Sequence, residues 1–252
     1  MQIDAIPAFE DNYIWALRHA GQVAAVDPGA AAPVLAYLQR TGNRLAAILV
    51  THHHGDHIGG IRELVAEFPV PVFGPAREAG DVVTRPLRDG ERATVLGVDF
   101  EVLEVPGHTR GHVAYYARDA GLFCGDTLFG AGCGRVFEGT LAEMHASLAR
   151  LAALPPATPV YCAHEYTQSC LRFAKTVEPG NCAIDARSAV VAARRAAGLP
   201  SVPSTLADEL ATNPFLRWSA PGVIAAATAR LGRRPANDAE TFGAIRLWRD
   251  SL

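Results

Sequence analysis

Hydrophobic residues in the first two thirds of the chain fall into short runs separated by glycine- and aspartate-rich turns, a pattern that predicts β-strands. Residues 45–50, LAAILV, form one continuous apolar run, which is typical of a strand buried on both faces. Residues 61–68 then place apolar side chains at helical spacing, and PVPVFG (69–74) returns to extended chain. The order strand, polar loop, helix, strand predicts a βαβ unit, whose functional loops gather at the carboxyl ends of the strands.

The composition and the hydrophobic pattern of the sequence change at about Tyr166. Before it, residues 14–30 predict a hairpin, residues 33–39 and 141–154 predict helices, and residues 93–126 alternate as antiparallel strands do. After it, Ala, Arg and Leu dominate, and the periodicity predicts helices near residues 168–177, 183–197, 222–230 and 238–250. We therefore predict two domains: a mixed α/β domain over residues 1–167 and an all-helical domain over residues 168–252.

Composition and charge exclude several classes of protein. The 252 residues are 49% hydrophobic, which suffices for an ordinary globular core. Because 23 Lys and Arg stand against 26 Asp and Glu, the net charge of −3 argues against nucleic acid and anionic membranes as partners. The start, MQIDAIPAFEDN, is acidic where a secretory signal is basic and apolar, and no apolar run approaches about 18 residues. These features predict a cytoplasmic protein without a membrane segment.

The five cysteines form an odd set without Cys-x-x-Cys spacing, which favours neither a disulfide framework nor a thiolate zinc site. Reduced thiols are therefore expected. Cys133 lies between glycines in AGCGR, and we expect it to pack in a tight loop rather than act as a nucleophile.

Four of the nine histidines lie within six positions of the stretch THHHGDHIGG, residues 51–60. On extended chain His52 and His54 point the same way, and His53 points the other way. Asp56 and His57 follow the turn at Gly55 and face a neighbouring position. Adjacent imidazoles after an apolar strand need a bound partner, so the stretch predicts parts of two metal sites.

Further ligands must come from elsewhere, since a catalytic metal usually has three protein ligands and an open position. Three more candidates each follow an apolar run: His108, Asp126 and His164. They therefore lie at the ends of predicted strands, where the functional residues of α/β sheets are usually found. Each histidine taken alone is more often a hydrogen-bonded structural residue. Asp126 has two carboxylate oxygens and could bridge ions about 3.5–4 Å apart. His19 and His145 are predicted to be surface residues.

The pattern T-H-x-H-x-D-H, with the later His108, Asp126 and His164, resembles the metallo-β-lactamase superfamily, whose αββα sandwich agrees with the predicted order of elements. Longer stretches are similar to the glyoxalase II (hydroxyacylglutathione hydrolase) family: GDTLFGAGCGRVFEGT (125–140), CAHEYT (162–167), STLADELATNPFLR (204–217) and the ending AIRLWRD (244–250). The resemblance runs essentially end to end. It implies an α/β fold: an αββα sandwich followed by a C-terminal all-helical domain.

The resemblance also implies an activity. The family hydrolyses S-D-lactoylglutathione and related 2-hydroxyacyl-glutathiones to glutathione and D-lactate or another 2-hydroxy acid, in methylglyoxal detoxification. The family's metal ligands match the residues named above and form two groups, one for each of two divalent ions. His52, His54 and His108 bind the first ion, Asp56, His57 and His164 bind the second, and Asp126 binds both. A hydroxide bridging the ions would attack the thioester, so Asp126, Asp56 and His57 act through it and no protein nucleophile is required. Zinc is the expected metal, and iron and manganese suit the same ligands.

In that family, basic and aromatic residues hold glutathione. The matching positions here are Arg135, Phe137, Tyr166, Arg246 and Arg249. Phe137 stands where some members have tyrosine, so one hydroxyl contact is absent. Guanidinium groups suit the two carboxylates of glutathione, and Arg246 and Arg249 share one helix face. A solvated helix surface is the alternative interpretation of this arginine pair.

Asp27 ends an apolar run as Asp126 does. Its carboxylate is a candidate to accept a hydrogen bond from the second N–H of a ligand imidazole. The alternative is that Asp27 only forms a turn. Rival functions are a mono-iron persulfide dioxygenase, a ribonuclease or lactamase of the same superfamily, and a metal-storage or sensing module. The sequence lacks the basic surface that a ribonuclease requires and the secretion signal that a lactamase requires. The presence of Asp56, His57 and His164, the whole second group of ligands, argues against the dioxygenase. We expect a monomer, because no exposed apolar helix face stands out.

Overall fold

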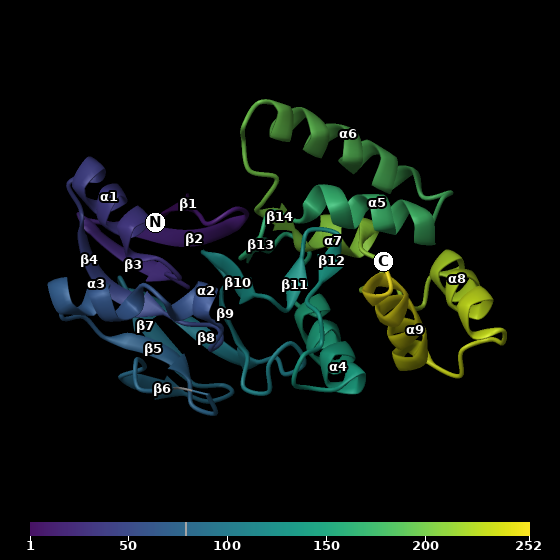
Figure 1. The fold of residues 1–252 in the computed structure, drawn as a ribbon, viewed down its shortest axis with the longest axis horizontal. Helices are drawn as coiled ribbons and strands as arrows, with labels where there is room; N and C mark the ends of the chain where they lie inside the picture. The colour runs from purple at the N-terminus through teal and green to yellow at the C-terminus, as the bar shows by residue number, and fades with distance from the viewer. Residues whose placement is uncertain (79) are drawn as a thin grey trace.

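Two six-stranded β-sheets form the centre of the computed structural model, which describes residues 1–78 and 80–252 (Figure 1). The first sheet contains, in spatial order, β1 (Gln2–Ala8), β2 (Asn12–His19), β3 (Gln22–Val26), β4 (Arg44–Leu49), β5 (Val72–Pro75) and β6 (Arg85–Leu87). The second contains β14 (Ser204–Thr205), β13 (Pro159–Cys162), β10 (Gly121–Gly125), β9 (Val113–Ala117), β8 (Val98–Glu104) and β7 (Arg92–Val95). A separate short hairpin is formed by β11 (Leu128–Phe129) and β12 (Gly132–Cys133).

Alternation along β2 shows how the layers form. Trp15 and Leu17 point into the core shared with the second sheet, whereas Ile14 and Ala16 join a second core beneath the helices α1 (Ala31–Thr41) and α3 (Ile61–Glu67). This is the two-residue period of a strand with both faces covered. The β3, β4, β5 and β6 strands run parallel, so the loops after them lie at one edge of the sheet.

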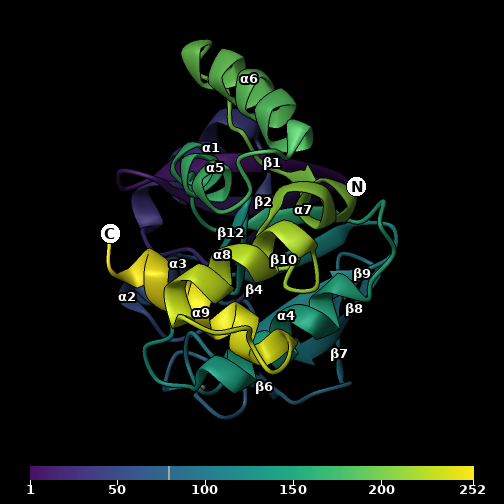
Figure 2. The same cartoon turned by 90° about the vertical axis from the view of Figure 1, so that its right-hand side faces the viewer.

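Helices cover the second sheet as well. Every residue of β10 is buried, and the core continues into α4 (Leu141–Ala152) and the C-terminal helices. Those helices are α5 (Thr167–Val177), α6 (Cys182–Ala196), α7 (Leu206–Thr212), α8 (Pro221–Leu231) and α9 (Asp238–Asp250). They lie together over one end of the strands, as the turned view shows (Figure 2). The predicted αββα sandwich with a C-terminal helical region is confirmed.

Three details differ from the sequence-based predictions. The strand β14 and the helix α7 were not predicted, because two and seven residues are too short for a periodic pattern. The helix α1 begins at Ala31 and not at Pro33 as predicted. A proline is tolerated in the first turn of a helix, because the N–H that it lacks would have no partner within the helix. His145 is not at the surface: it is half-buried, with its ring centroid 4.5 Å from that of Trp218.

The division into domains at residues 167 and 168 stays a prediction; helix α5 begins at Thr167. In the described part of the chain, no helix combines the length and the apolar character needed to cross a membrane.

Candidate metal centre

The histidine stretch leaves the first sheet at the end of β4 and passes into a single helical turn, α2 (Gly55–Ile58). Its first two predicted ligands meet a residue from the loop after β8. The Nδ1 atom of His54 lies 3.1 Å from Nε2 of His52 and 3.1 Å from Nε2 of His108. Three imidazole nitrogens at such spacing fit around one ion with metal–nitrogen bonds of about 2.0–2.1 Å.

A second group lies beside the first. The Oδ2 atom of Asp56 is 3.4 Å from Nε2 of His57 and 3.6 Å from Nε2 of His164. These three residues also form a possible metal-binding set by their mutual distances. The turn into α2 brings Asp56 and His57 toward His164, while His57 also stays close enough to His52 and Asp126 to form a further possible metal-binding set.

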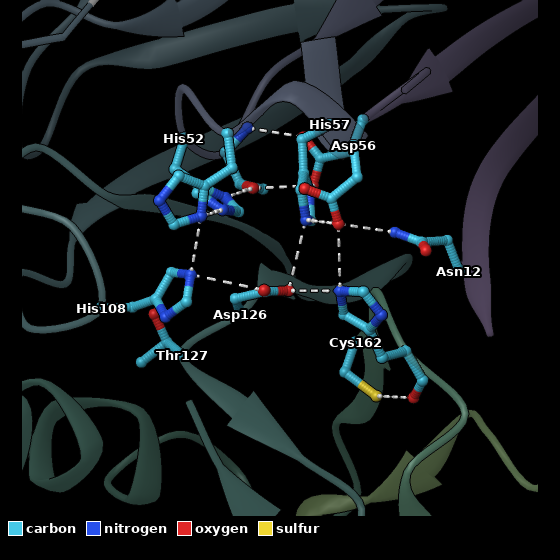
Figure 3. Close-up of polar contacts among 12 residues, drawn as sticks. Asn12, His52, Asp56, His57, His108, Asp126, Thr127 and Cys162 are labelled. Carbon is cyan, nitrogen blue, oxygen red and sulfur yellow. Dashed lines mark hydrogen bonds and ion pairs between the residues drawn. The ribbon is translucent and has the colours of Figure 1, made fainter. Parts of the chain in front are cut away.

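Asp126 lies between the two groups (Figure 3). One carboxylate oxygen, Oδ1, is 3.5 Å from Nε2 of His57 and 3.3 Å from Nε2 of His164. The other, Oδ2, is 3.4 Å from Nε2 of His108. A single carboxylate thus presents one oxygen to each group, the arrangement that a bridging ligand requires.

Two buried atoms at this point have unmet bonding capacity. Neither Nε2 of His57 nor Oδ1 of Asp126 has a hydrogen-bond partner within residues 1–78 and 80–252. A buried polar atom without a partner is costly, so a cation between them would fit the site. The seven converging groups offer nitrogen and oxygen only, which suits zinc, iron and manganese.

The electrostatics of the site favour positive charge. Although burial opposes the charged form, the imidazoles of His57 and His164 hold the pKa of Asp126 well below its usual range. Burial also opposes protonation of His57, but Asp126 and Asp27 raise its pKa well above the usual value. Burial lowers the pKa of His52 well below its usual value, which keeps that ring neutral and able to bind metal.

The imidazoles of His57, His164 and His108 each have a contact at the nitrogen that faces away from the centre. Nδ1 of His57 lies 3.1 Å from Asp27, whose carboxylate also accepts hydrogen bonds from the N–H and hydroxyl of Thr51, both at 2.7 Å. Nδ1 of His164 lies 2.8 Å from Asp11, and Nδ1 of His108 lies 2.8 Å from the carbonyl of Arg135. Such contacts fix the orientation of the ring that a metal needs.

Sequence reasoning missed two of these neighbours. Asp11 lies in the turn between β1 and β2, 153 positions from its partner His164, and nothing local marks it. His112 is fully buried and stacks on His52 with ring centroids 4.6 Å apart, while its Nε2 accepts a hydrogen bond from the backbone N–H of Asp126. The second Gly-His pair in GHTRGH was the available signal.

His53 lies outside both converging groups. His53 is exposed, and its Nε2 is 2.8 Å from Oε1 of the half-buried Glu138. Its ring centroid is 5.1 Å from that of His54, and His53, His54 and Glu138 also meet the distances of a possible metal-binding set, so the outward orientation of His53 stays a prediction.

Substituting Asp27 with asparagine is expected to weaken metal binding by about 10- to 100-fold, the usual effect of losing a partner of a ligand imidazole. Asparagine keeps the size but removes the charge that faces His57. The measurement is competition for Zn²⁺ between the protein and a chromophoric chelator. Unchanged affinity would show that Asp27 serves only the turn at its left-handed backbone position (φ 52°).

Four of the five predicted substrate-binding residues line one pocket of about 250 Å³ beside this centre: Arg135, Tyr166, Arg246 and Arg249. The ring of Tyr166 stacks on His164 at 4.7 Å, which connects the pocket to the metal centre. Phe137, the fifth, is not among the residues that line this pocket; it is 61% exposed, and its ring centroid is 5.3 Å from that of His108.

Arg246 differs from the free cation expected from the sequence. It is buried, and it already donates to the carbonyl of Cys133 at 3.0 Å and to Asp250 at 2.8 Å. Its Nε remains without a partner in the described structure. Arg246 therefore contributes a wall of the pocket rather than a mobile charge.

Comparison with known proteins gives consistent matches. The family model described as "Metallo-beta-lactamase superfamily" matches residues 9–164, and "Hydroxyacylglutathione hydrolase C-terminus" matches residues 165–252. A protein of Dechloromonas aromatica (strain RCB), named hydroxyacylglutathione hydrolase, is 53% identical over 265 residues and covers 100% of both chains.

Two solved structures are similar. ETHE1 from Myxococcus xanthus has a TM-score of 0.66 and 24% identity, covering 86% of this chain and 84% of its own, which shows the fold alone. TTHA1623 in a di-iron-bound form has a TM-score of 0.54 and 32% identity, covering 65% of this chain and 92% of its own. The superfamily match and the cluster of histidines and aspartates together indicate a di-metal site.

Proposed function

Since the chain belongs to the hydroxyacylglutathione hydrolase family, we propose that it hydrolyses the thioester of S-D-lactoylglutathione and related 2-hydroxyacyl-glutathiones to glutathione and the 2-hydroxy acid. The observation that carries the proposal is the carboxylate of Asp126, which presents one oxygen to each of two groups of ligands beside a pocket lined by arginines. In the cell this reaction would consume the thioester formed from methylglyoxal and glutathione.

The proposed ligands are the seven residues predicted from the sequence. His52, His54 and His108 would hold one cation, Asp56, His57 and His164 the other, and Asp126 both. Two bound cations would supply an activated water at neutral pH and polarise the thioester carbonyl. We propose zinc, with iron and manganese as alternatives, and the similar di-iron protein shows that this fold can hold iron.

The residues around the centre have separate tasks. Asp56, His57 and Asp126 fix the place from which water approaches the carbonyl carbon. A C–O bond forms, the C–S bond breaks, and glutathione leaves as a thiolate that needs little assistance. No side chain is required as a nucleophile: burial raises the pKa of the Cys133 thiol to about 11, and that thiol faces Arg246.

The pocket suits the charge of the tripeptide. Arg135 and Arg249 line it and can each pair with a carboxylate of glutathione, while Tyr166 lies between them and the metal centre. Phe137 offers an exposed ring beside His54 and His108. We propose further that the protein acts as a monomer in the cytoplasm.

The direct test is release of thiol from S-D-lactoylglutathione by the purified protein. We expect steady hydrolysis with no accumulation of an acyl-enzyme. Oxygen uptake with glutathione persulfide, in place of thiol release, would identify a dioxygenase. Metal binding without turnover of either compound would identify a storage or sensing protein.

Replacing Arg249 with alanine is expected to raise KM for S-D-lactoylglutathione about tenfold, while kcat changes little. The reason is that one charge-assisted hydrogen bond to a remote carboxylate, about 1.5 kcal/mol, stabilises bound substrate and transition state alike. Arg172→Ala is the matched control, because Arg172 is an exposed arginine on α5 that does not line this pocket. Equal KM values for both variants would remove Arg249 from the proposed binding site.

A further inference from the structure

The long motif STLADELATNPFLR (204–217) supplies Phe215 to the lining of the pocket and no residue to the proposed metal centre. It contains β14 and α7, and its Glu209 is a carboxylate with no exposed surface. A carboxylate so deeply buried in the helical region needs several donors to be stable. The location of those donors shows what the motif holds in place.

Glu209 receives hydrogen bonds from four donors. Its Oε1 accepts from Arg187 at 2.5 Å and from the hydroxyl of Ser204 at 2.6 Å. Its Oε2 accepts from the side-chain amide of Asn213 at 3.1 Å and from the backbone N–H of Ala131 at 2.7 Å. Ala131 lies outside the helical region, at the tip of the hairpin formed by β11 and β12.

Asn213 holds the same hairpin. Its side-chain amide donates to the carbonyls of Gly132, at 2.9 Å, and Phe129, at 3.3 Å, while its oxygen accepts from the N–H of Phe215. Ala131 adopts a left-handed backbone conformation with φ 55°, which a residue with a side chain keeps only when its surroundings enforce it. The hydrogen bond from Ala131 to Glu209, and those from Asn213 to the carbonyls of Phe129 and Gly132, support that conformation.

Both ends of this hairpin reach the metal centre. Asp126 lies two positions before β11, and Arg135, whose carbonyl contacts Nδ1 of His108, lies two positions after β12. The ends are also tied to each other: the N–H of Gly134 donates to the carbonyl of Thr127 at 3.2 Å. A Cβ on Gly134 would lie 1.9 Å from the carbonyl oxygen of Asp126, so only glycine permits this approach.

We propose that Glu209 and Asn213 are positioning residues for the metal centre. By fixing the tip of the β11–β12 hairpin, they fix the carboxylate of Asp126 and the carbonyl that orients His108. The helical region thus sets the metal affinity of the α/β region as well as binding substrate. This inference rests on the proposed function only in treating Asp126 and His108 as ligands.

The test compares Glu209→Gln and Asn213→Asp with Glu178→Gln. Glutamine cannot accept from all four donors of Glu209, and aspartate cannot donate to the two carbonyls held by Asn213. Glu178→Gln is the matched control: Glu178 is also a buried carboxylate of the helical region, paired with Arg217 at 2.6 Å, and it does not touch the hairpin. Melting temperatures show how far each variant is destabilised.

We expect Glu209→Gln and Asn213→Asp to weaken Zn²⁺ binding by about 10- to 100-fold, measured by competition with a chromophoric chelator, and Glu178→Gln to stay within about twofold of wild type. The amide of Ala131 should also exchange with deuterium at least about tenfold faster in the first two. Affinities equal to wild type, or a matching loss in Glu178→Gln, would overturn the proposal. If Glu209→Gln does not fold, Asn213→Asp decides.

These readouts do not depend on thioester hydrolysis. Wild-type protein that binds Zn²⁺ but releases no thiol would contradict the proposed function, and the comparison of affinities would still test the positioning role.

Discussion

Replacing Asp126 with asparagine should lower kcat/KM for S-D-lactoylglutathione by about 10³-fold, even with metal in excess. The amide keeps the shape of the side chain, but it loses a negative charge and turns an N–H₂ group toward one group of ligands. Loss of several kcal/mol of charge stabilisation corresponds to a change of this size. Initial rates of thiol release, measured over a range of added Zn²⁺, give the value.

The control is Asp119→Asn, since Asp119 is an exposed carboxylate in the turn between β9 and β10. We expect its rate to stay within about twofold of wild type, as is usual for surface substitutions. Near-normal activity of Asp126→Asn at saturating metal would show that a bridging carboxylate is not needed, and the proposed mechanism would fall.

The second large effect concerns the histidine stretch itself. His57→Gln should lower kcat/KM by at least about 10²-fold and reduce the bound metal, because a ligand at Nε2 and the pairing with Asp27 are both lost. His53→Gln should leave activity within about threefold of wild type, since its imidazole contacts Glu138 at the surface instead.

The two substituted residues, His53 and His57, lie only four positions apart in the chain. Equal losses of activity would therefore contradict the division of the stretch into metal-facing and outward-facing residues. Metal content by emission spectroscopy and rates of thiol release, measured on the same samples, provide the comparison. A loss for His53→Gln alone would reverse the proposed assignment.

Local patterns predicted individual strands and helices, and the family resemblance supplied the layers of the fold. The apolar run over residues 45–50 became β4 with buried positions facing both cores, and the alternation in β2 divides its side chains between the same two cores. The family predicted from the longer motifs is confirmed. Short elements such as β14 and α7 were missed, because their positions depend on contacts with distant segments.

The predicted ligands could be found from sequence because each follows a strand and four of them are neighbours. The residues that orient them could not. Asp11 and the carbonyl of Arg135 act across long separations in the chain, and a backbone carbonyl carries no residue signature at all. The pairing of Arg246 with Asp250, four positions on in the same predicted helix, was available from the sequence, but the hydrogen bond of Arg246 to the distant carbonyl of Cys133 was not.

One stretch of chain, residues 52–57, is proposed to supply ligands to two metal ions that act together. Titrating metal-free protein with Zn²⁺, while recording both bound metal and thiol release from S-D-lactoylglutathione, tests it most directly. We predict that activity rises to its maximum only as the second ion binds, at two per chain. Full activity with one ion per chain, or with none, would contradict the account.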